Sequence, residues 1–431
     1  MKGNKEMFNT NFVFTPGKVT TTMDCSAGSS GKGKLGSFIC EHADNWQFAC
    51  HAFMANAAHW VILDDGSKYL YQTLASIAYL HERYEKTYIC GGAVIEKDSF
   101  FRELEENGIP PHKIGIHPLT AVVQQIDVDY ERGLCDIDGN YFPDRKVNEN
   151  LKLGSTLHGV GAARARRILR KNNTLYARDV PELAPFICDT REEIIKRLKD
   201  GQAGLLEVAQ GFQLGYLEPR FAPRTTSRNC TVAAGLDDCG IPPHYAHHVV
   251  INCRTFPIRV NSNKYVDKRS GKILTFPDMD EMRAKGEEEF IETIKGNSGA
   301  CYEDQEETTW EKVTEQSGIK EIDPAAKVIE MSSLTKLPRR VYTFSKINLA
   351  EAIEYNRANG EVFISVNFAN YVDARLTGVR DVLSNDVKDE EGKYTKIHKW
   401  LDENVRPIVN EHKAHLKFLG TGAKTDDMLM L

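Results

Sequence analysis

A glycine-rich loop that follows a β-branched segment constrains the fold of this chain more than any other feature of its sequence. Residues 18–25 are rich in threonine and valine, which predicts a buried strand. Residues 35–41 have the pattern of the start of a helix. The loop between them contains Gly28-Ser29-Ser30-Gly31-Lys32-Gly33-Lys34. These segments predict a strand, a phosphate-binding loop and a helix in direct succession.

The loop has the composition that phosphate binding requires. Glycine allows several backbone N–H groups to converge on one anion after a strand, and lysine supplies positive charge. The full Gly-x-x-x-x-Gly-Lys-Ser/Thr pattern is absent, so this is not an ordinary Walker A loop. A flexible surface turn of the same composition is the alternative interpretation.

Short apolar runs alternate with amphipathic stretches along the rest of the chain. Residues 60–63, 204–207, 249–252 and 362–368 are apolar runs, and residues 194–199 have a helical pattern. Neither a repeat nor a low-complexity linker divides the sequence. We therefore predict an α/β fold with a mostly parallel central sheet, in a single large domain over residues 1–431.

Charge and cysteine usage argue against several classes of protein. The chain has 61 acidic and 55 basic residues and a net charge of −6, which is unlike a nucleic-acid coat or a membrane-surface protein. Residues 1–10 lack a signal-peptide core, and no apolar stretch has the length of a membrane span. The ten cysteines include no CxxC pair. We expect a soluble cytoplasmic protein that binds neither nucleic acid nor membrane, with charged residues 280–289 and 386–394 in solvated helices or loops.

Further motifs follow the loop in a fixed order. Asn56-Ala57-Ala58-His59 resembles Asn-Ala-Gly-His, residues 154–161 resemble Gly-Thr-Thr-x-x-Gly-Ile-Gly, and residues 207–211 resemble Glu-Gly-Ala-Gln-Gly. Residues 226–229, 240–243, 257–260, 334–337 and 420–422 continue the series. With the loop, whose counterpart is Gly-Asp-Glu-Gly-Lys-Gly-Lys, these motifs are similar to those of the adenylosuccinate synthetase family. The resemblance extends from Gly28 to Gly422, over nearly the whole chain.

The resemblance implies a purine-nucleotide ligase that works as a homodimer. Enzymes of this family transfer the γ-phosphoryl group of a nucleoside triphosphate to O6 of a 6-oxopurine nucleotide, and the amine of aspartate then displaces the phosphate. It implies that Ser29, Lys32 and His59 are catalytic, with His59 donating to O6 or to the phosphoryl group. It implies Mg²⁺ on the triphosphate, near Ser29 and Ala58. The implied ATP-binding residues are Ser30, Gly31, Lys32, Gly33, Lys34, Lys336, Gly420 and Gly422.

The resemblance also implies residues for the other two substrates. Arg170 would reach the substrate of the neighbouring subunit, although its basic stretch, residues 164–171, could instead be a solvated helix face. For Ser155 and Thr226 the alternative is a turn or cap hydroxyl. The family's aspartate-binding arginines are missing from residues 308–314, which leaves Thr308, Thr309 and Lys312 as candidates. The implied purine-nucleotide residues are Ser29, Asn56, Ser155, Thr156, Arg170, Gln210, Thr226 and Arg259.

Two departures from the family bear on the substrates. Ser29 stands where the family has an aspartate that takes the N1 proton of the purine and ligates magnesium. Either the loop is inactive, or the substrate is a guanine nucleotide. A serine leaves room for the 2-amino group of guanine and can accept a hydrogen bond from it. Pro338 replaces the aspartate that recognises GTP, which favours ATP or dATP as the donor. Lys336 contacts the donor base or is simply a surface lysine.

These departures resemble the bacteriophage branch of the family, which condenses dGMP with L-aspartate to N6-succino-2-amino-2'-deoxyadenylate. A phage-encoded enzyme would act in the host cytoplasm. A conventional synthetase that uses IMP and GTP, and a catalytically silent purine-nucleotide sensor, are the alternatives. Residues 244–248 contain three histidines, of which His244 and His248 would share a helix face. We expect a helix after Gly240 there and no metal site, since no cysteine or carboxylate accompanies them at ligand spacing.

Overall fold

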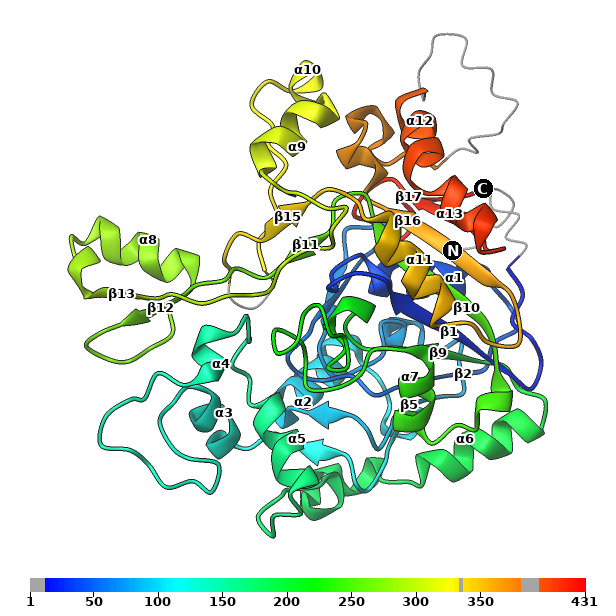
Figure 1. The fold of residues 1–431 in the computed structure, drawn as a ribbon. Coiled ribbons are helices and arrows are strands. Elements are labelled where there is room, and N and C mark those ends of the chain that lie inside the picture. The colour runs from blue at the N-terminus through cyan, green and yellow to red at the C-terminus, as the bar shows by residue number, and fades with distance from the viewer. Residues whose placement is uncertain (1–11, 333–335, 381–394) are drawn as a thin grey trace.

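A nine-stranded sheet lies at the centre of the molecule (Figure 1). The computed structural model describes residues 12–332, 336–380 and 395–431. In order across the sheet, the strands are β18 (Met428–Met430), β17 (His415–Gly420), β16 (Val362–Asn367), β10 (Ala246–Arg254), β1 (Val19–Asp24), β9 (Gly204–Glu207), β2 (Phe48–His51), β5 (Lys86–Ile89) and β7 (Ile114–Ile116).

Neighbouring strands in this sheet are parallel, apart from the antiparallel edge pair β17 and β18. All six side chains of β1 are buried. Such continuous burial is typical of a parallel strand covered by helices on both faces of its sheet. The predicted α/β fold with a mostly parallel central sheet is confirmed.

Helices and smaller sheets surround the central sheet. The α-helices are α1 (Lys32–His42), α2 (Lys97–Asn107), α3 (Gln125–Glu131), α4 (Glu149–Lys152), α5 (Val160–Ile168), α6 (Thr190–Lys199), α7 (Val232–Cys239), α8 (Phe276–Ala284), α9 (Trp310–Ser317), α10 (Ile319–Ile322), α11 (Lys346–Glu354), α12 (Thr395–Asn404) and α13 (Arg406–Glu411). The smaller sheets pair β3 (His59–Ile62) with β4 (Lys68–Tyr71), β6 (Val94–Ile95) with β8 (Ala121–Val122), β12 (Lys264–Asp267) with β13 (Ile291–Ile294), and β15 (Arg340–Tyr342) with both β11 (Ile258–Arg259) and β14 (Glu307–Thr308).

The hairpin β12–β13 and helix α8 extend away from the central sheet, with α3 and α4 near them on the same side (Figure 1). The β12–β13 hairpin and α8 together form an arm. The base of this arm lies beside α4, where the backbone N–H of Asn297 donates to the carbonyl of Lys152 over 2.8 Å. None of the described helices is both long enough and apolar enough to span a lipid bilayer. The arm is relevant to function because its first residues reach back to the carboxyl ends of the sheet.

The sequence predicted the strand and helix segments well where burial is uniform. Strands occupy the predicted runs at 204–207 and 249–252 and nearly all of 362–368, and α6 contains residues 194–199. The helix after the glycine loop begins at Lys32, three residues earlier than predicted. The strand at 60–63 pairs with β4 and lies outside the central sheet. Residues 386–394 lie outside the described residues.

The prediction of a helix at residues 244–248 is wrong. A short 3₁₀ turn, η6 (Pro243–Tyr245), ends there and β10 begins at Ala246. The β-branched run that follows pairs with β1 and β16, and this pairing extends the strand back through the histidines. The pairing with β1 is irregular between Ala246 and Val249, and the rings of His247 and His248 lie edge to face with their centroids 4.2 Å apart.

Candidate active site

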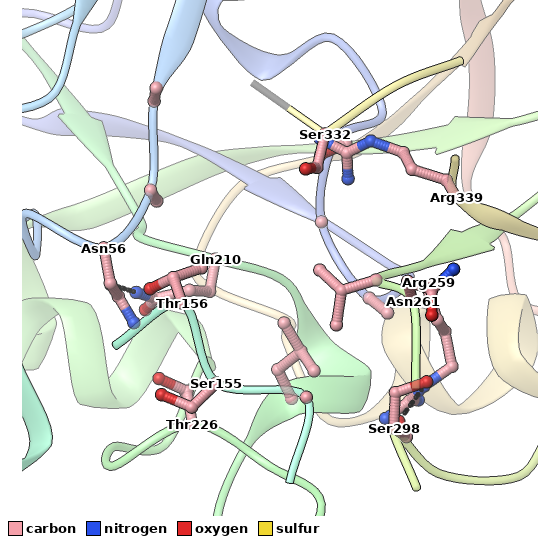
Figure 2. Close-up of a pocket in the computed structure, with 18 of the residues that line it drawn as sticks. Asn56, Ser155, Thr156, Gln210, Thr226, Arg259, Asn261, Ser298, Ser332 and Arg339 are labelled. Atoms are coloured by element: carbon pink, nitrogen blue, oxygen red, sulfur yellow. Dashed lines mark hydrogen bonds between the residues drawn. The ribbon is translucent and has the colours of Figure 1, made fainter. Parts of the chain in front are cut away.

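A cavity of about 540 Å³ opens beside the glycine loop that follows β1. Its lining comes from segments far apart in the sequence: the glycine loop, residues 56–60, residues 153–156, residues 224–227 and residues 259–261. Figure 2 shows Asn56, Thr156 and Gln210 on one side of it and Arg259 and Ser298 on the other. A crevice at the carboxyl ends of parallel strands is where open α/β sheets bind ligands.

The glycine loop turns sharply before α1. Gly28, Ser29 and Gly31 have positive φ angles of 86°, 56° and 87°. Gly31 is the N-cap residue of α1, so the free N–H groups of the first helical turn face the loop. The positive end of the helix dipole and these donors together favour a bound phosphate.

Lys32 and Gln210 connect the loop to the opposite strand. The Nζ of Lys32 donates to the backbone carbonyl of Gln210, and the Nε2 of Gln210 donates to Oδ1 of Asn56 over 3.0 Å. A Cβ atom on Gly211 would lie 2.1 Å from the carbonyl oxygen of Ser26, so only glycine fits there. Burial lowers the pKa of the Lys32 ammonium, and the nearby Asp24 carboxylate partly opposes this shift. A phosphate beside Lys32 would stabilise its charged form.

Three buried polar side chains at the ends of strands hold the loop in place. Asp24 accepts from the backbone N–H of Ser26 over 2.9 Å and from the hydroxyl of Ser30 over 2.8 Å. Asn252 donates to the carbonyl of Ser30 over 2.7 Å, and Arg254 donates to the carbonyl of Ser29 over 2.8 Å. The loop therefore keeps its shape without a bound nucleotide.

We expect Asp24→Asn to lower the free energy of unfolding by about 1–3 kcal/mol, because the amide cannot accept all the hydrogen bonds that the buried carboxylate accepts. Urea denaturation measures the change. Asp65→Asn is the matched control, since Asp65 accepts from the backbone N–H of Ser67 over 2.8 Å at an exposed position. Equal effects of the two substitutions would contradict a special role of Asp24.

His59 lies against the start of α1 and faces the cavity. Its exposed fraction is 8%, and a Cβ atom on Gly33 would lie 3.1 Å from the Cβ atom of His59. In the part of the chain that the structure describes, neither ring nitrogen of His59 has a hydrogen-bond partner. Burial, followed by the positive charge of Lys32, holds the pKa of His59 well below its usual value. The imidazole is therefore neutral near pH 7 and has an N–H group free for a ligand.

Within the described part of the chain, five buried side-chain atoms at the cavity wall lack hydrogen-bond partners. Most buried polar atoms in proteins are paired, so such a concentration marks a place where a ligand supplies the partners. The five atoms are Oγ1 of Thr156, Oγ1 of Thr226, Oε1 of Gln210, Nε of Arg224 and Nη1 of Arg259.

The structure brings many of the predicted site residues together at this cavity. Those that line it are Ser29, Gly31, Lys32, Gly33, Asn56, Ala58, His59, Ser155, Thr156, Gln210, Thr226, Arg259 and Lys336.

Several predicted nucleotide-binding residues do not line the cavity. Ser30 is buried beneath the loop, and Gly420 lies at the end of β17. The Nζ of Lys34 donates to the carbonyls of Gly422 and Asp427 over 2.8 and 2.6 Å. Lys34 therefore holds the C-terminal segment against α1 in this structure.

The remaining predicted residues lie farther away. Arg170 is exposed just beyond the end of α5. Thr308 ends β14, and Thr309 is the N-cap of α9, with its hydroxyl accepting from the backbone N–H of Lys312. Thr309 and Lys312 are exposed, and none of these three residues lines the cavity.

Sequence reasoning missed the charged residues at the back of the cavity. Arg254 is fully buried, forms an ion pair with Glu330 and lies 4.2 Å from the ring of Phe368. Arg254 contacts the cavity residues Glu330 and Phe368 from behind, whereas Arg224, Lys264 and Arg339 line the cavity themselves. Arg254 could have been found from the sequence, because it is an arginine at the end of an apolar run, β10, and ligand sites lie at the ends of such strands.

Comparison with known proteins gives relatives of one kind. A scan against protein-family models finds no match. The N6-succino-2-amino-2'-deoxyadenylate synthase of Salmonella phage PMBT28 is 31% identical over 372 residues, which cover 83% of this chain and 86% of that protein. The adenylosuccinate synthetase of Pyrococcus horikoshii is 27% identical over 240 residues, which cover 55% of this chain and 66% of that protein.

The fold of a solved structure agrees. The succinoaminodeoxyadenylate synthetase of cyanophage S-2L, bound to dGMP and to dATP as an energy donor, superimposes with a TM-score of 0.67 at 24% identity. The match covers 96% of this chain and 95% of that chain.

Proposed function

Because the chain belongs to the family of the phage N6-succino-2-amino-2'-deoxyadenylate synthases and is a carbon–nitrogen ligase of that type, we propose that it condenses dGMP with L-aspartate. The product is N6-succino-2-amino-2'-deoxyadenylate, the precursor of 2-aminoadenine in DNA. Hydrolysis of ATP or dATP to the diphosphate and phosphate drives the reaction.

The observation that supports this proposal is the convergence of the glycine loop, Lys32 and an unpaired neutral His59 at one cavity. In the first step, O6 of guanine attacks the γ-phosphorus of the triphosphate, the bond to the bridging oxygen breaks so that the nucleoside diphosphate leaves, and the N1 proton of guanine passes to solvent. Lys32 and the N–H groups at the start of α1 hold the negative charge that spreads over the phosphoryl group. His59 donates its N–H to O6 or to a phosphoryl oxygen.

In the second step, the amine of aspartate attacks C6 of the 6-phosphoryl intermediate. The C6–O6 bond breaks and inorganic phosphate leaves with O6. The protein contributes by holding the amine near C6, because a positioned nucleophile reacts far faster than a free one. Asn56, Thr156, Gln210 and Thr226 orient the purine nucleotide from one side of the cavity (Figure 2).

Ser29 supports a guanine substrate over hypoxanthine. Its side chain is exposed at the loop and lines the cavity, and its backbone carbonyl is held by Arg254. Guanine carries a 2-amino donor beside N1, and the serine hydroxyl can accept a hydrogen bond from it. An aspartate at the same place would occupy more of the space beside that group.

Pro338 supports an adenine donor over guanine. Its ring offers no acceptor for the N1 and N2 hydrogens of guanine. Its backbone carbonyl accepts from the side chain of Asn261 over 3.3 Å, so that group is already engaged within the protein. Lys336 lines the cavity at the same end and is the residue through which this segment would contact the donor nucleotide.

Magnesium fits this cavity as an ion held mainly by substrate phosphates. The oxygens of Asp24 are engaged by Ser26 and Ser30, so the loop offers the hydroxyl of Ser29 and, opposite it, the carbonyl of Ala58. Mg²⁺ commonly takes few protein ligands when it binds a nucleotide. When bound, it would neutralise charge on the triphosphate.

A homodimer would give Arg170 a role in substrate binding. Its side chain is exposed and lies outside the cavity of its own subunit. The preceding residues Ile168 and Leu169 are 70% and 58% exposed, and a second copy of the chain packed over them would bring Arg170 to the partner's cavity. Sedimentation equilibrium would detect the dimer.

The direct test uses purified protein with magnesium, ATP and L-aspartate. dGMP and IMP are offered separately, and phosphate release is followed together with the mass of the succinyl product. We expect turnover with dGMP. Turnover with IMP alone would instead indicate a conventional synthetase, and no turnover with either nucleotide would favour a nucleotide sensor.

We expect Ser29→Asp to reduce kcat/KM for dGMP by about tenfold to a hundredfold, because the added carboxylate crowds the 2-amino group. The ratio of kcat/KM values for dGMP and IMP measures the change, and IMP is the internal control because it lacks that group. Ser67→Asp, at a distant loop, controls for added charge. Unchanged dGMP turnover by the Ser29→Asp variant would refute this account of the loop.

A further inference from the structure

Two cations at the cavity wall, the buried Lys264 and the partly buried Arg224, have no side-chain partner among the described residues. Among the described residues, neither the Nζ of Lys264 nor the guanidinium of Arg224 forms a hydrogen bond or an ion pair. Of the other cations that line the cavity, Lys336 is exposed to solvent. The remaining three are engaged: Lys32 with the carbonyl of Gln210, Arg259 with the carbonyl of Ser298, and Arg339 with the carbonyl of Met331.

Lys264 is the first residue of β12, at the base of the arm. It pairs with Ile294 across the hairpin, and its exposed fraction is only 3%, although it lines the cavity. Burial alone lowers its pKa to about 8, and no acidic side chain opposes the shift. Lysine is seldom buried without a partner, so an anion that enters the cavity is its natural counter-charge.

Arg224 belongs to the same wall as Arg259 and Ser298. The backbone carbonyl of Arg224 accepts from Nη2 of Arg259 over 3.0 Å, and Nε of Arg259 donates to the carbonyl of Ser298 over 2.7 Å. The Nε of Arg224 is buried without a partner. Figure 2 shows Arg259, Asn261 and Ser298 grouped across the cavity from Asn56, Thr156 and Gln210.

The carboxylates at the cavity cannot neutralise these cations. Glu131 accepts from the backbone N–H groups of Gly159 and Gly161, each over 2.9 Å. Glu330 forms an ion pair with Arg254. Two unpaired cations, one of them a guanidinium that can bind a carboxylate through two parallel hydrogen bonds, match a ligand with two carboxylates.

We propose that Lys264 and Arg224 bind the two carboxylates of L-aspartate, as the dicarboxylate subsite of this chain. Both residues line the same cavity as Arg259, whose guanidinium contacts the backbone carbonyl of Arg224. This assignment rests on the proposed function and places the aspartate subsite away from Thr308, Thr309 and Lys312, which do not reach the cavity.

The test compares Lys264→Met, Lys264→Arg and Arg224→Gln with the unaltered protein. We expect KM for L-aspartate to rise at least about tenfold in Lys264→Met and Arg224→Gln, while KM for dGMP stays within about twofold. Lys264→Arg should regain most of the affinity. Lys268→Met is the matched control, because Lys268 is exposed on the same hairpin and donates to the carbonyl of Glu289. Thermal unfolding confirms that each variant is folded.

A second readout does not depend on turnover. Succinate has the two carboxylates of aspartate without its amine, and its binding is measured by titration calorimetry in the presence of dGMP. We expect its affinity to fall as the pH rises through about 8, where Lys264 loses its proton in the free protein. The Lys264→Arg variant should not show this decline, since arginine stays charged.

The results of these experiments distinguish a failure of the proposed function from a failure of the proposed aspartate subsite. If the unaltered protein does not turn over dGMP with aspartate, the proposed function fails whatever the variants show. If it does and the variants keep their KM for aspartate and their affinity for succinate, the subsite is wrong. A rise confined to KM for dGMP would also refute it, because it would place Lys264 and Arg224 at the 5'-phosphate of the nucleotide.

Discussion

His59→Asn is expected to lower kcat for phosphate release by about a hundredfold to ten-thousandfold, with KM for dGMP nearly unchanged. Asparagine keeps a short polar side chain but places its donor away from the position of the imidazole N–H. In the proposed mechanism the loss falls on kcat, because His59 would donate to the group whose charge develops during phosphoryl transfer. Steady-state rates at saturating substrates measure the effect.

The pH dependence gives a further check on His59. Its pKa lies well below the usual value because burial and the charge of Lys32 disfavour the imidazolium. The ring is therefore already neutral throughout the range from about pH 6 to pH 8, and its titration should not change kcat there. A fall in kcat below about pH 6.5 that disappears in His59→Asn would contradict this expectation. It would show that the pKa of His59 is not lowered and that the protein is inactive when the ring is protonated.

His112→Asn is the matched control for this substitution. His112 is exposed in a short 3₁₀ helix, η2 (Pro111–Lys113), and does not line the cavity. The same chemical change there should leave kcat unaltered. A His59→Asn variant as active as His112→Asn would remove His59 from the reaction.

Lys32→Met is expected to lower kcat about a hundredfold to a thousandfold, as loss of one preorganised donor to a transition-state oxygen does. Methionine has a similar length and no charge, so the loop loses its buried cation while much of the packing remains. The contact with the carbonyl of Gln210 is lost as well. Phosphate release measures kcat, and nucleotide titration followed by calorimetry measures binding of the donor.

Lys68→Met separates this effect from a general loss of positive charge. Lys68 is exposed at the start of β4, outside the cavity. Its replacement should leave both kcat and donor binding as they are. If Lys32→Met weakened donor binding without changing kcat at saturation, Lys32 would hold the ground-state nucleotide and have no special contact in the transition state.

The geometry of the glycine loop was predictable because it depends on local sequence. A strand of β-branched residues, glycines that allow positive φ, and a helix that starts at Lys32 are neighbours in the chain, so their geometry follows from short-range backbone preferences. His59, Asn56 and Gln210 were predicted through their motifs and do face the same cavity. The predicted α/β sheet followed from apolar runs that are buried on both faces.

The helix predicted at residues 244–248 is absent because long-range strand pairing overrides the local pattern there. Residues 244–248 have no strong local preference, and pairing with β1 and β16 makes most of them part of a strand. Thr309 and Lys312 belong to the first turn of α9, where the threonine hydroxyl caps the helix. Capping satisfies a backbone N–H locally and keeps the pair at the surface.

The sequence by itself determined the glycine loop between a strand and a helix, the order of the family's motifs, and the presence of Ser29, on which the proposal of a guanine substrate rests. Only the tertiary structure decided which charges meet at the cavity. Asp24 and Arg254 brace the loop because parallel strands end side by side, and Lys264 reaches the cavity because the β12–β13 hairpin folds back beside α4. Burial then leaves Lys264 unpaired, and burial depends on contacts between distant segments that no local pattern in the sequence records.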